Sequence, residues 1–147
     1  MKPSFIQTCL SLLLLASIQP AYAGTVTVTP SNQANSLPLG GQGGTQSTQI
    51  IKVGTISLST TSENGFTLNI SGSNLAKSDG QTPISIEMTT VPSNDPAPST
   101  GFTQSYSYQN NTPVASETRD LYIKYTPASL QDPGNYSTFL NLTIGDN

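Results

Sequence analysis

Residues 121–144 constrain the fold more than any other stretch, because they hold two alternating runs joined by one recognisable turn. Side chains on a strand repeat with period two, so Leu121, Ile123 and Tyr125 share one face. In the second run one face holds Tyr136, Thr138, Leu140, Leu142 and Ile144. Between the runs, Asp132-Pro133-Gly134 has the Pro and Gly typical of a type II turn. The sequence therefore predicts two strands around a corner.

Alternating apolar runs recur through the rest of the chain, and no segment after residue 23 has a helical period. We therefore expect an all-β sandwich of about seven short strands. The runs cover residues 25–29, 50–60, 66–70, 84–88, 102–108, 121–125 and 136–144. The polar connection 71–83 has Leu75 as its expected buried anchor. Residues 91–101 contain three prolines, which remove backbone donors, and are expected to form an exposed loop.

The parity of the apolar residues changes within the run 50–60. Ile51 and Val53 share one face, whereas Ile56 and Leu58 lie on the other, and Gly54 stands at the change. Two interpretations are open. Gly54 marks a β-bulge or bend, or the strand is buried on both faces.

The N-terminus has the pattern of a secretory signal. Lys2 precedes an apolar run over residues 10–18, and Ala21-Tyr22-Ala23 precedes Gly24 as a cleavage site of the A-x-A type. The run is too short to span a bilayer. Cys9 lies within this segment, so the exported chain is expected to contain no cysteine and no membrane span. We therefore expect a secreted protein, in the periplasm, at the cell surface or outside the cell.

Residues 24–49 are predicted to be an N-terminal strand followed by a flexible linker rich in Gly, Ser, Asn and Gln, and residues 50–147 the sandwich domain. The whole chain has 5 basic and 8 acidic residues. Loss of Lys2 leaves 4 basic residues, for a mature balance of 4 − 8 = −4. A basic surface for nucleic acid is absent, so we expect no nucleic-acid partner.

Few residues after the leader suit catalysis or metal binding. The mature chain has no His and no Cys, so the usual general base, thiolate and zinc ligands are missing. We expect no enzyme activity, cofactor or metal. Two weaker hypotheses are a carboxylate pair of Glu117 and Asp120, and a calcium site at Asp79 with Asp95 or Asp132. A sugar-binding patch is a third hypothesis, and it would use the aromatic rings of Tyr106, Tyr108, Tyr122 and Tyr125.

The order Leu130, Asp132, Gly134 and Tyr136 resembles the corner before strand F of immunoglobulin-like sandwiches, where a Tyr hydroxyl bonds back to the backbone. In that fold a strand G pairs with F. Here the sequence ends three residues after Ile144, so we expect strand F to present an unpaired edge. Residues 25–29 offer a cover, with Val26 and Val28 on one face.

Two segments, DPGNYSTFLNLTI (132–144) and VGTISLSTTSENGFTLNISGSNL (53–75), resemble bacterial fimbrial subunits of the chaperone-usher class and spore-coat-protein-U-like pilus proteins. The resemblance implies a sandwich that lacks its last strand and receives one from a neighbour. It also implies partners among copies of the chain or related subunits, and an exported chaperone.

Two functions follow as hypotheses. The first is a secreted structural or adhesive subunit of a fimbrium, another surface appendage or an extracellular matrix, with residues 25–29 acting in trans as the assembly strand. The alternative is a monomeric secreted module that binds carbohydrate or another exported ligand, with residues 25–29 folded in cis as its first strand.

The leader hypothesis predicts an exported protein that begins at Gly24 and contains no thiol. Intact mass spectrometry of the secreted protein measures both properties. A mass that includes Cys9 or an attached lipid would contradict the expected localisation.

Overall fold

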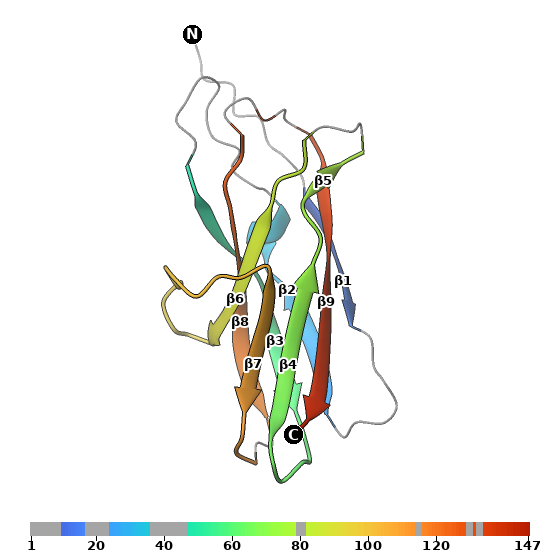
Figure 1. The fold of residues 1–147 in the computed structure, drawn as a ribbon, viewed down its shortest axis with the longest axis vertical. Coiled ribbons are helices and arrows are strands. Elements are labelled where there is room, and N and C mark those ends of the chain that lie inside the picture. The colour runs from blue at the N-terminus through green and yellow to red at the C-terminus, as the bar shows by residue number, and fades with distance from the viewer. Residues whose placement is uncertain are drawn as a thin grey trace.

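The computed structural model of this chain contains two β-sheets that lie face to face (Figure 1). It describes residues 10–16, 24–35, 47–78, 82–113, 116–128, 131 and 134–147. The elements are β1 (Leu10–Ala16), β2 (Thr25–Pro30), the 3-10 helix η1 (Asn32–Asn35), β3 (Gln49–Ser59), β4 (Phe66–Gly72), β5 (Ala76–Lys77), β6 (Ile86–Pro92), β7 (Ser105–Asn110), β8 (Glu117–Tyr125) and β9 (Tyr136–Asp146).

Each sheet joins strands from both halves of the chain. The first sheet has the order β1-β9-β4-β7, with β5 pairing the start of β9, and the second has the order β2-β3-β8-β6. All pairings are antiparallel except that of β1 with β9. The predicted all-β class is therefore confirmed. Among the described residues, no helix is long and apolar enough to cross a membrane.

Several strand boundaries differ from the prediction, including the start of β8, which begins at Glu117 and not at Leu121. β6 continues through Val91 to Pro92, into a stretch expected to be loop. Pro92 is tolerated there because it ends a strand at the edge of the sheet, where a missing backbone donor removes little pairing. β7 begins only at Ser105, since Phe102 and Thr103 belong to the connection that reaches back to Met88.

The core lies between the sheets and follows the predicted alternation. On β9 the inward residues Tyr136, Leu140 and Leu142 are fully buried. They face the second sheet, whose inward side chains include Ile56, Leu58, Leu121, Ile123 and Tyr125. Leu75 is also fully buried, and its backbone exchanges two hydrogen bonds with Ile84. Leu75 therefore anchors the connection after β4, as predicted.

The parity change in β3 is a β-bulge. The register with β8 shifts between Lys52 and Gly54, so Val53 is the extra residue. Val53 is completely buried, and Ile56 and Leu58 beyond the bulge are buried on the same side. A bulge restores a common inward face after the slip, which decides between the two interpretations left open by the sequence.

β2 belongs to the sandwich and is not a detached strand. It pairs with β3 from Thr25↔Ser59 to Pro30↔Gly54. η1 follows it directly, with Ala34 buried. The boundary expected between residues 49 and 50 therefore does not separate the N-terminal strand from the domain, because a ladder of backbone hydrogen bonds joins them. Residues 36–46 of the expected linker lie outside the described residues.

The corner before β9 is held by a residue that the sequence analysis did not single out. Tyr136 has no exposed surface, and its hydroxyl accepts a hydrogen bond from Gln131 Nε2 at 2.7 Å. The same amide nitrogen donates to the Thr82 carbonyl at 3.1 Å. Gly134 has φ of 151°, a conformation that favours glycine. Leu130 and Asp132 lie outside the described residues.

Two substitutions on the inward face of β9 test this packing. Tyr136→Phe is expected to lower the free energy of unfolding by about 0.5 to 1.5 kcal/mol, because it removes a buried hydroxyl from its hydrogen bond. Leu140→Ala is expected to lower it by about 2 to 5 kcal/mol, since it also leaves a cavity. Chemical denaturation measures both, and a neutral Leu140→Ala would contradict the assignment of this face.

Candidate functional site

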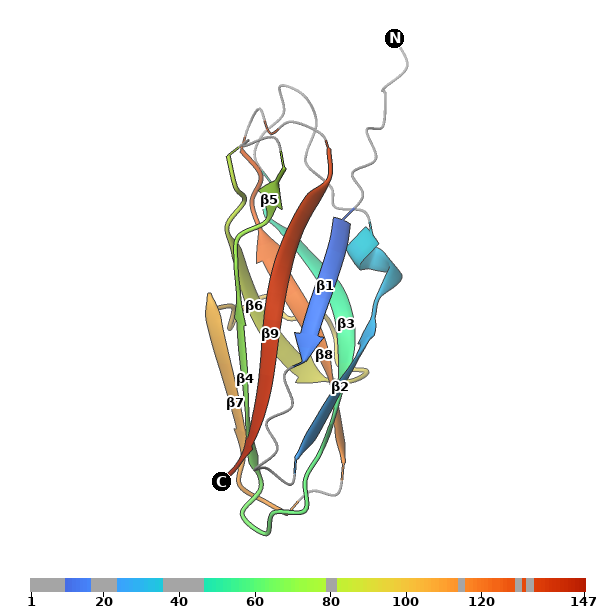
Figure 2. The ribbon, with the colours of Figure 1, turned by 90° about the vertical axis from the view of Figure 1, so that its right-hand side faces the viewer.

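The outer edge of β9 is the candidate site. One side of β9 pairs with β4, and the other side pairs in parallel with β1. The β1 register runs from Leu10↔Tyr136 to Ala16↔Leu142. In Figure 2, β1 lies between β9 of the first sheet and β2 of the second. β1 therefore closes one open side of the sandwich.

β1 covers only part of this edge. Its last pairing is at Leu142, while β9 continues to Asp146. Past the end of β1, the half-buried Ile144 packs against the core beside Gly24, where an added Cβ would lie 3.2 Å from the Ile144 side chain. The start of β2 therefore reaches the lower end of the β9 edge.

The predicted assembly residues lie elsewhere. Val26 and Val28 face Leu58 and Ile56 of β3 within the same chain, and Val26 is 6% exposed. The structure therefore has the cis arrangement of residues 25–30, in which these valines pair with β3 and not with β9. The edge of β3 lies close to β2 along the chain, which explains why β2 pairs with β3 and not with the β9 strand of a neighbouring copy.

The opposite side of the sandwich is closed by polar side chains, which we call the Arg119 cluster: Thr90, Tyr106, Tyr108, Asn110, Glu117 and Arg119. Arg119 is 5% exposed and stacks its guanidinium 3.6 Å from the centre of the Tyr108 ring. It donates to the Glu117 carboxylate at 2.8 Å and to the Thr90 hydroxyl at 2.8 Å. The buried charge is thus both paired and hydrogen-bonded.

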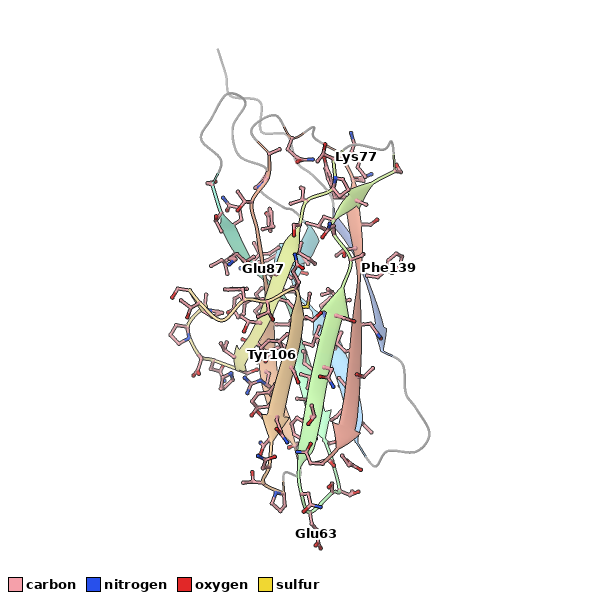
Figure 3. All side chains as sticks on the ribbon, in the orientation of Figure 1. Glu63, Lys77, Glu87, Tyr106 and Phe139 are labelled. Carbon is pink, nitrogen blue, oxygen red and sulfur yellow. The ribbon has the colours of Figure 1, made fainter. Side chains whose placement is uncertain are left out.

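The cluster ties the edge strand β7 to the second sheet. Tyr108 donates to Glu117 at 2.9 Å, and Asn110 donates to the other carboxylate oxygen at 3.1 Å. Tyr106, labelled in Figure 3, has its hydroxyl 3.0 Å from the Thr90 hydroxyl. Three consecutive inward residues of β7 therefore bond across the gap between the sheets.

Glu117 and Asp120 do not form a carboxylate pair. Glu117 faces inward in the Arg119 cluster. Asp120 faces the opposite side of β8, where it pairs with Lys52 at 2.8 Å and accepts hydrogen bonds from Thr55 and Ser93. A general acid needs a carboxyl group that holds its proton near neutral pH. Neither residue has that environment.

Burial disfavours the charged form of both carboxylates, but their partners outweigh it. Hydrogen bonds from Arg119, Asn110 and Tyr108 hold the pKa of Glu117 below its usual value. Hydrogen bonds from Lys52, Thr55 and Ser93 do the same for the pKa of Asp120. Burial, together with the hydrogen bond to Glu117, raises the pKa of Tyr108. All three shifts favour fixed ion pairs and a neutral phenol.

The four tyrosines of the sugar-binding hypothesis do not form an exposed platform. Tyr106 and Tyr108 pack against the core, and Tyr122 and Tyr125 are 8% and 2% exposed. Their strand positions point them into the sandwich or beneath neighbouring side chains. The exposed aromatic ring on the first sheet is Phe139, which is 53% exposed and projects away from β9 (Figure 3).

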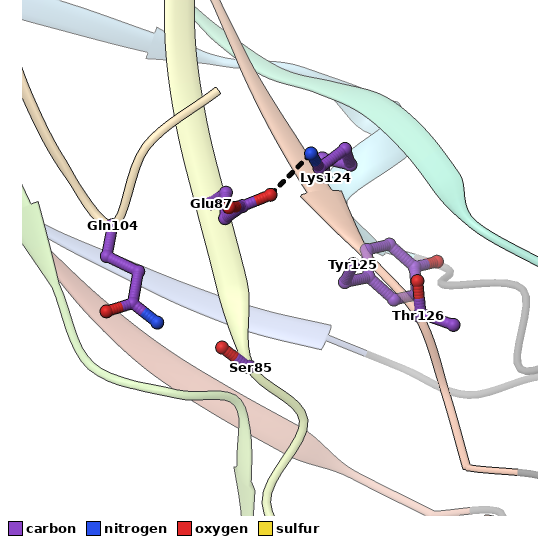
Figure 4. Close-up of a pocket in the computed structure, with 6 residues that line it drawn as sticks. All are labelled: Ser85, Glu87, Gln104, Lys124, Tyr125 and Thr126. Carbon is purple, nitrogen blue, oxygen red and sulfur yellow. Dashed lines mark ion pairs between the residues drawn. The ribbon is translucent and has the colours of Figure 1, made fainter. Parts of the chain in front are cut away.

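A small hollow at the start of β6 and the end of β8 offers little to a ligand. Its volume is about 200 Å³, and it is lined by Ser85, Glu87, Gln104, Lys124, Tyr125 and Thr126 (Figure 4). Glu87 and Lys124 pair with each other at 2.5 Å. Ligand pockets usually enclose about 300 to 1,000 Å³. This hollow is smaller, and its two charges neutralise each other.

No group of three acidic, His or Cys side chains able to hold a metal ion occurs in the part of the chain that the structure describes. Of the proposed calcium ligands, Asp79 and Asp132 lie outside the described residues. Asp95 lies on an exposed turn after β6, where its backbone nitrogen donates to the Pro92 carbonyl.

Sequence reasoning missed two of these features. The pairing of residues 10–16 with β9 had no signal beyond an apolar run, which also fits a leader. The inward position of Arg119 could have been predicted, because Arg119 alternates in step with Leu121 and Ile123 and so lies on their inward face.

No protein family model, curated protein or solved structure matches this chain.

The two paired carboxylates predict how stability depends on pH. Each has a lower pKa in the folded state, so its contribution is complete above the unfolded pKa of about 4 and is lost as pH falls through the folded value. We expect the free energy of unfolding to decline below about pH 4. Glu117→Gln and Asp120→Asn should each lower stability at pH 7 and weaken this decline. Denaturation across pH measures both effects.

Glu63→Gln is the matched control, since Glu63 is exposed at the tip of the β3–β4 connection (Figure 3). It should leave the pH profile close to that of the natural chain. Equal effects of all three substitutions would contradict the specific role of Glu117 and Asp120.

Proposed function

We propose that this protein is a secreted, non-enzymatic structural or adhesive subunit that assembles at the cell surface by accepting a strand along β9. The observation that carries the proposal is the identity of the segment beside β9. Residues 10–16, which pair with β9 from Tyr136 to Leu142, are also the apolar run of the expected secretory leader. Cleavage before Gly24 would remove the neighbour of β9.

Loss of β1 would expose both backbone and core. A row of N–H and C=O groups on β9 would lose its partners, and an unpaired strand edge is a template for another strand. The inward side chains of Tyr136, Leu140 and Leu142 are fully buried and lie just behind that edge. A new strand with alternating apolar residues would restore both the ladder and the cover.

The strand order supports an immunoglobulin-like topology. In such sandwiches one sheet holds strands A, B, E and D and the other holds C, F and G. The order β2-β3-β8-β6 fits A-B-E-D, and β4 and β9 fit C and F. β1 then occupies the place of G. Strand G follows F through a hairpin and runs antiparallel to it, whereas β1 runs parallel. This difference favours a substitute strand in the G position.

The absence of enzyme activity remains part of the proposal. It is supported by the absence of His and Cys after residue 23 and by the fixed ion pairs of Glu117 and Asp120. The proposed partners are copies of the chain or related subunits, with an exported chaperone as an earlier occupant of the edge.

The donor strand is constrained by the cis position of β2. If residues 25–30 acted as the donor to a neighbour, they would first have to leave β3 and expose the β3 edge. An incoming strand from a different segment or subunit avoids that loss. The acceptor edge on β9 does not depend on which segment donates the strand. The experiment therefore tests the acceptor edge.

The test compares the mature chain with a version that carries its own extra strand. In this version a short Gly-containing turn and a copy of TVTVTP follow Asn147, so that the copy can pair beside β9. We expect the mature chain to form oligomers and to melt about 5 to 10 °C below the extended version. The extended version is expected to lose the oligomers that form through β9. Calorimetry and light scattering measure these properties.

The control extension replaces the two copied valines with aspartates, which keeps the length but cannot enter an apolar groove. It should neither raise the melting temperature nor remove the oligomers that form through β9. A mature chain that forms no oligomers larger than a dimer and is as stable as the valine extension would contradict an open β9 edge.

A further inference from the structure

The outer edge of β7 differs from the other edges of the two sheets. Among the described strands, none pairs with this side of β7. β6, at the edge of the second sheet, exchanges two backbone hydrogen bonds between Met88 and Thr103 and ends in Pro92. β2 ends in Pro30 and contacts β9 of the first sheet. β7 thus ends its sheet without a covering strand.

β7 also lacks the devices by which proteins protect an edge. Its sequence is SYSYQN, with no charged residue, no proline and no register shift against β4. Charged side chains, prolines and bulges are the usual means of preventing edge-to-edge pairing. The carbonyl of Ser105 accepts a hydrogen bond from the Thr103 hydroxyl at 2.8 Å, but a carbonyl keeps a second lone pair.

The Arg119 cluster holds this edge in place. Tyr106, Tyr108 and Asn110 are bonded to Thr90 and Glu117 of the second sheet. These contacts point every second residue of β7 inward and leave Ser105, Ser107 and Gln109 exposed. The edge is therefore held in place with its alternate residues exposed, so pairing would require little ordering of the strand.

We propose that β7 is a lateral interface at which two copies of this protein pair antiparallel, edge to edge, about a two-fold axis at Ser107. The occupant must be a strand, because only a strand satisfies a row of unpaired backbone donors and acceptors. A second β7 fits because it is uncharged, so the facing side chains include no like charges. About a two-fold axis, both copies contribute the same residues to the interface.

The alternation of inward and exposed side chains along β7 limits the possible registers. Residues directly opposite in an antiparallel pair lie on the same face, so exposed residues must meet exposed residues. An axis at Ser107 places Ser107 opposite itself, Ser105 opposite Gln109, and Tyr106 opposite Tyr108. An axis at Tyr108 is also compatible with the alternation but places Ser105 beyond the end of the partner's strand. An axis at Ser107 likewise leaves Asn110 beyond the partner's strand, so both registers pair five residues of β7. The axis at Ser107 is preferred because it places two small Ser side chains, and not two Tyr108 rings, directly opposite each other at the centre of the interface.

This interface is independent of the proposed strand addition at β9. β7 and β9 lie on opposite sides of β4 in the same sheet. Pairing at β7 closes after two copies, whereas repeated strand addition at β9 continues along a chain of subunits. Failure of one leaves the other unchanged.

The absence of cysteine after residue 23 permits a direct test. Single substitutions Ser105→Cys, Ser107→Cys and Gln109→Cys are made in the mature chain and oxidised. Facing Cα atoms in antiparallel strands lie about 4.5 to 5.5 Å apart, within the range of about 4.4 to 6.8 Å that a disulfide spans. Of the three single variants, we expect only Ser107→Cys to form disulfide-linked dimers. Ser105→Cys and Gln109→Cys should each fail alone and form a mixed dimer when combined.

Asn69→Cys is the matched control, since Asn69 is exposed on the same sheet face but on the central strand β4. It should form no disulfide-linked dimer. Dimers of Asn69→Cys at the level of Ser107→Cys would show random collision and overturn the proposal, as would the absence of any Ser107→Cys dimer. Dimers of Ser105→Cys alone would overturn the stated register. In the cysteine-free version that carries the TVTVTP extension, whose β9 edge is filled, Ser107→Lys should weaken dimer formation in sedimentation equilibrium, whereas Asn69→Lys should not.

Discussion

The backbone of β9 must be hydrogen-bonded on both sides, and the rest of the sandwich depends on how that requirement is met. β4 satisfies one side from Leu140 to Asp146, and β5 pairs with Tyr136 and Ser137 on the same side. The other side is satisfied by residues 10–16, in a parallel pairing that a hairpin partner could not make. Because the inward side chains of β9 are fully buried, the strand cannot lose this neighbour without exposing part of the core.

The other open side of the sandwich is closed by side-chain contacts and not by a backbone-paired strand. Arg119 is buried with its charge neutralised by Glu117 and its face covered by Tyr108. Breaking such a pair by removing one partner is strongly unfavourable, because it leaves an uncompensated buried charge. The cluster therefore holds β7 against β8 without covering the β7 edge. One side of the molecule is closed by a segment expected to leave, and the other by residues that stay.

Much of the fold follows from patterns visible in the sequence. The alternation of residues 136–144 and 121–125 predicted the inward faces of β9 and β8, and Gly54 marked the bulge in β3. The candidate site at the edge of β9 was harder to predict from the sequence. Alternation shows which face of a strand is buried, but it does not show which strand lies beside it. Val26 and Val28 fit an apolar groove at β9 and an apolar face at β3 equally well, and only the three-dimensional arrangement places them at β3.

The two proposed contacts extend the same sheet in opposite directions. The order β1-β9-β4-β7 has the strand-accepting edge at one end and the uncovered β7 edge at the other. A subunit that used both would carry its neighbours on either side of β4, with the Ser, Thr, Asn and Gln side chains of this sheet forming an uncharged face around the exposed ring of Phe139. Like charges are absent from that face, where the outward residues are Thr67, Asn69, Ser71, Ser105, Ser107, Gln109, Ser137, Phe139, Asn141 and Thr143. Neighbouring sheets would therefore meet without electrostatic repulsion, which is what lateral assembly of a negatively charged protein requires.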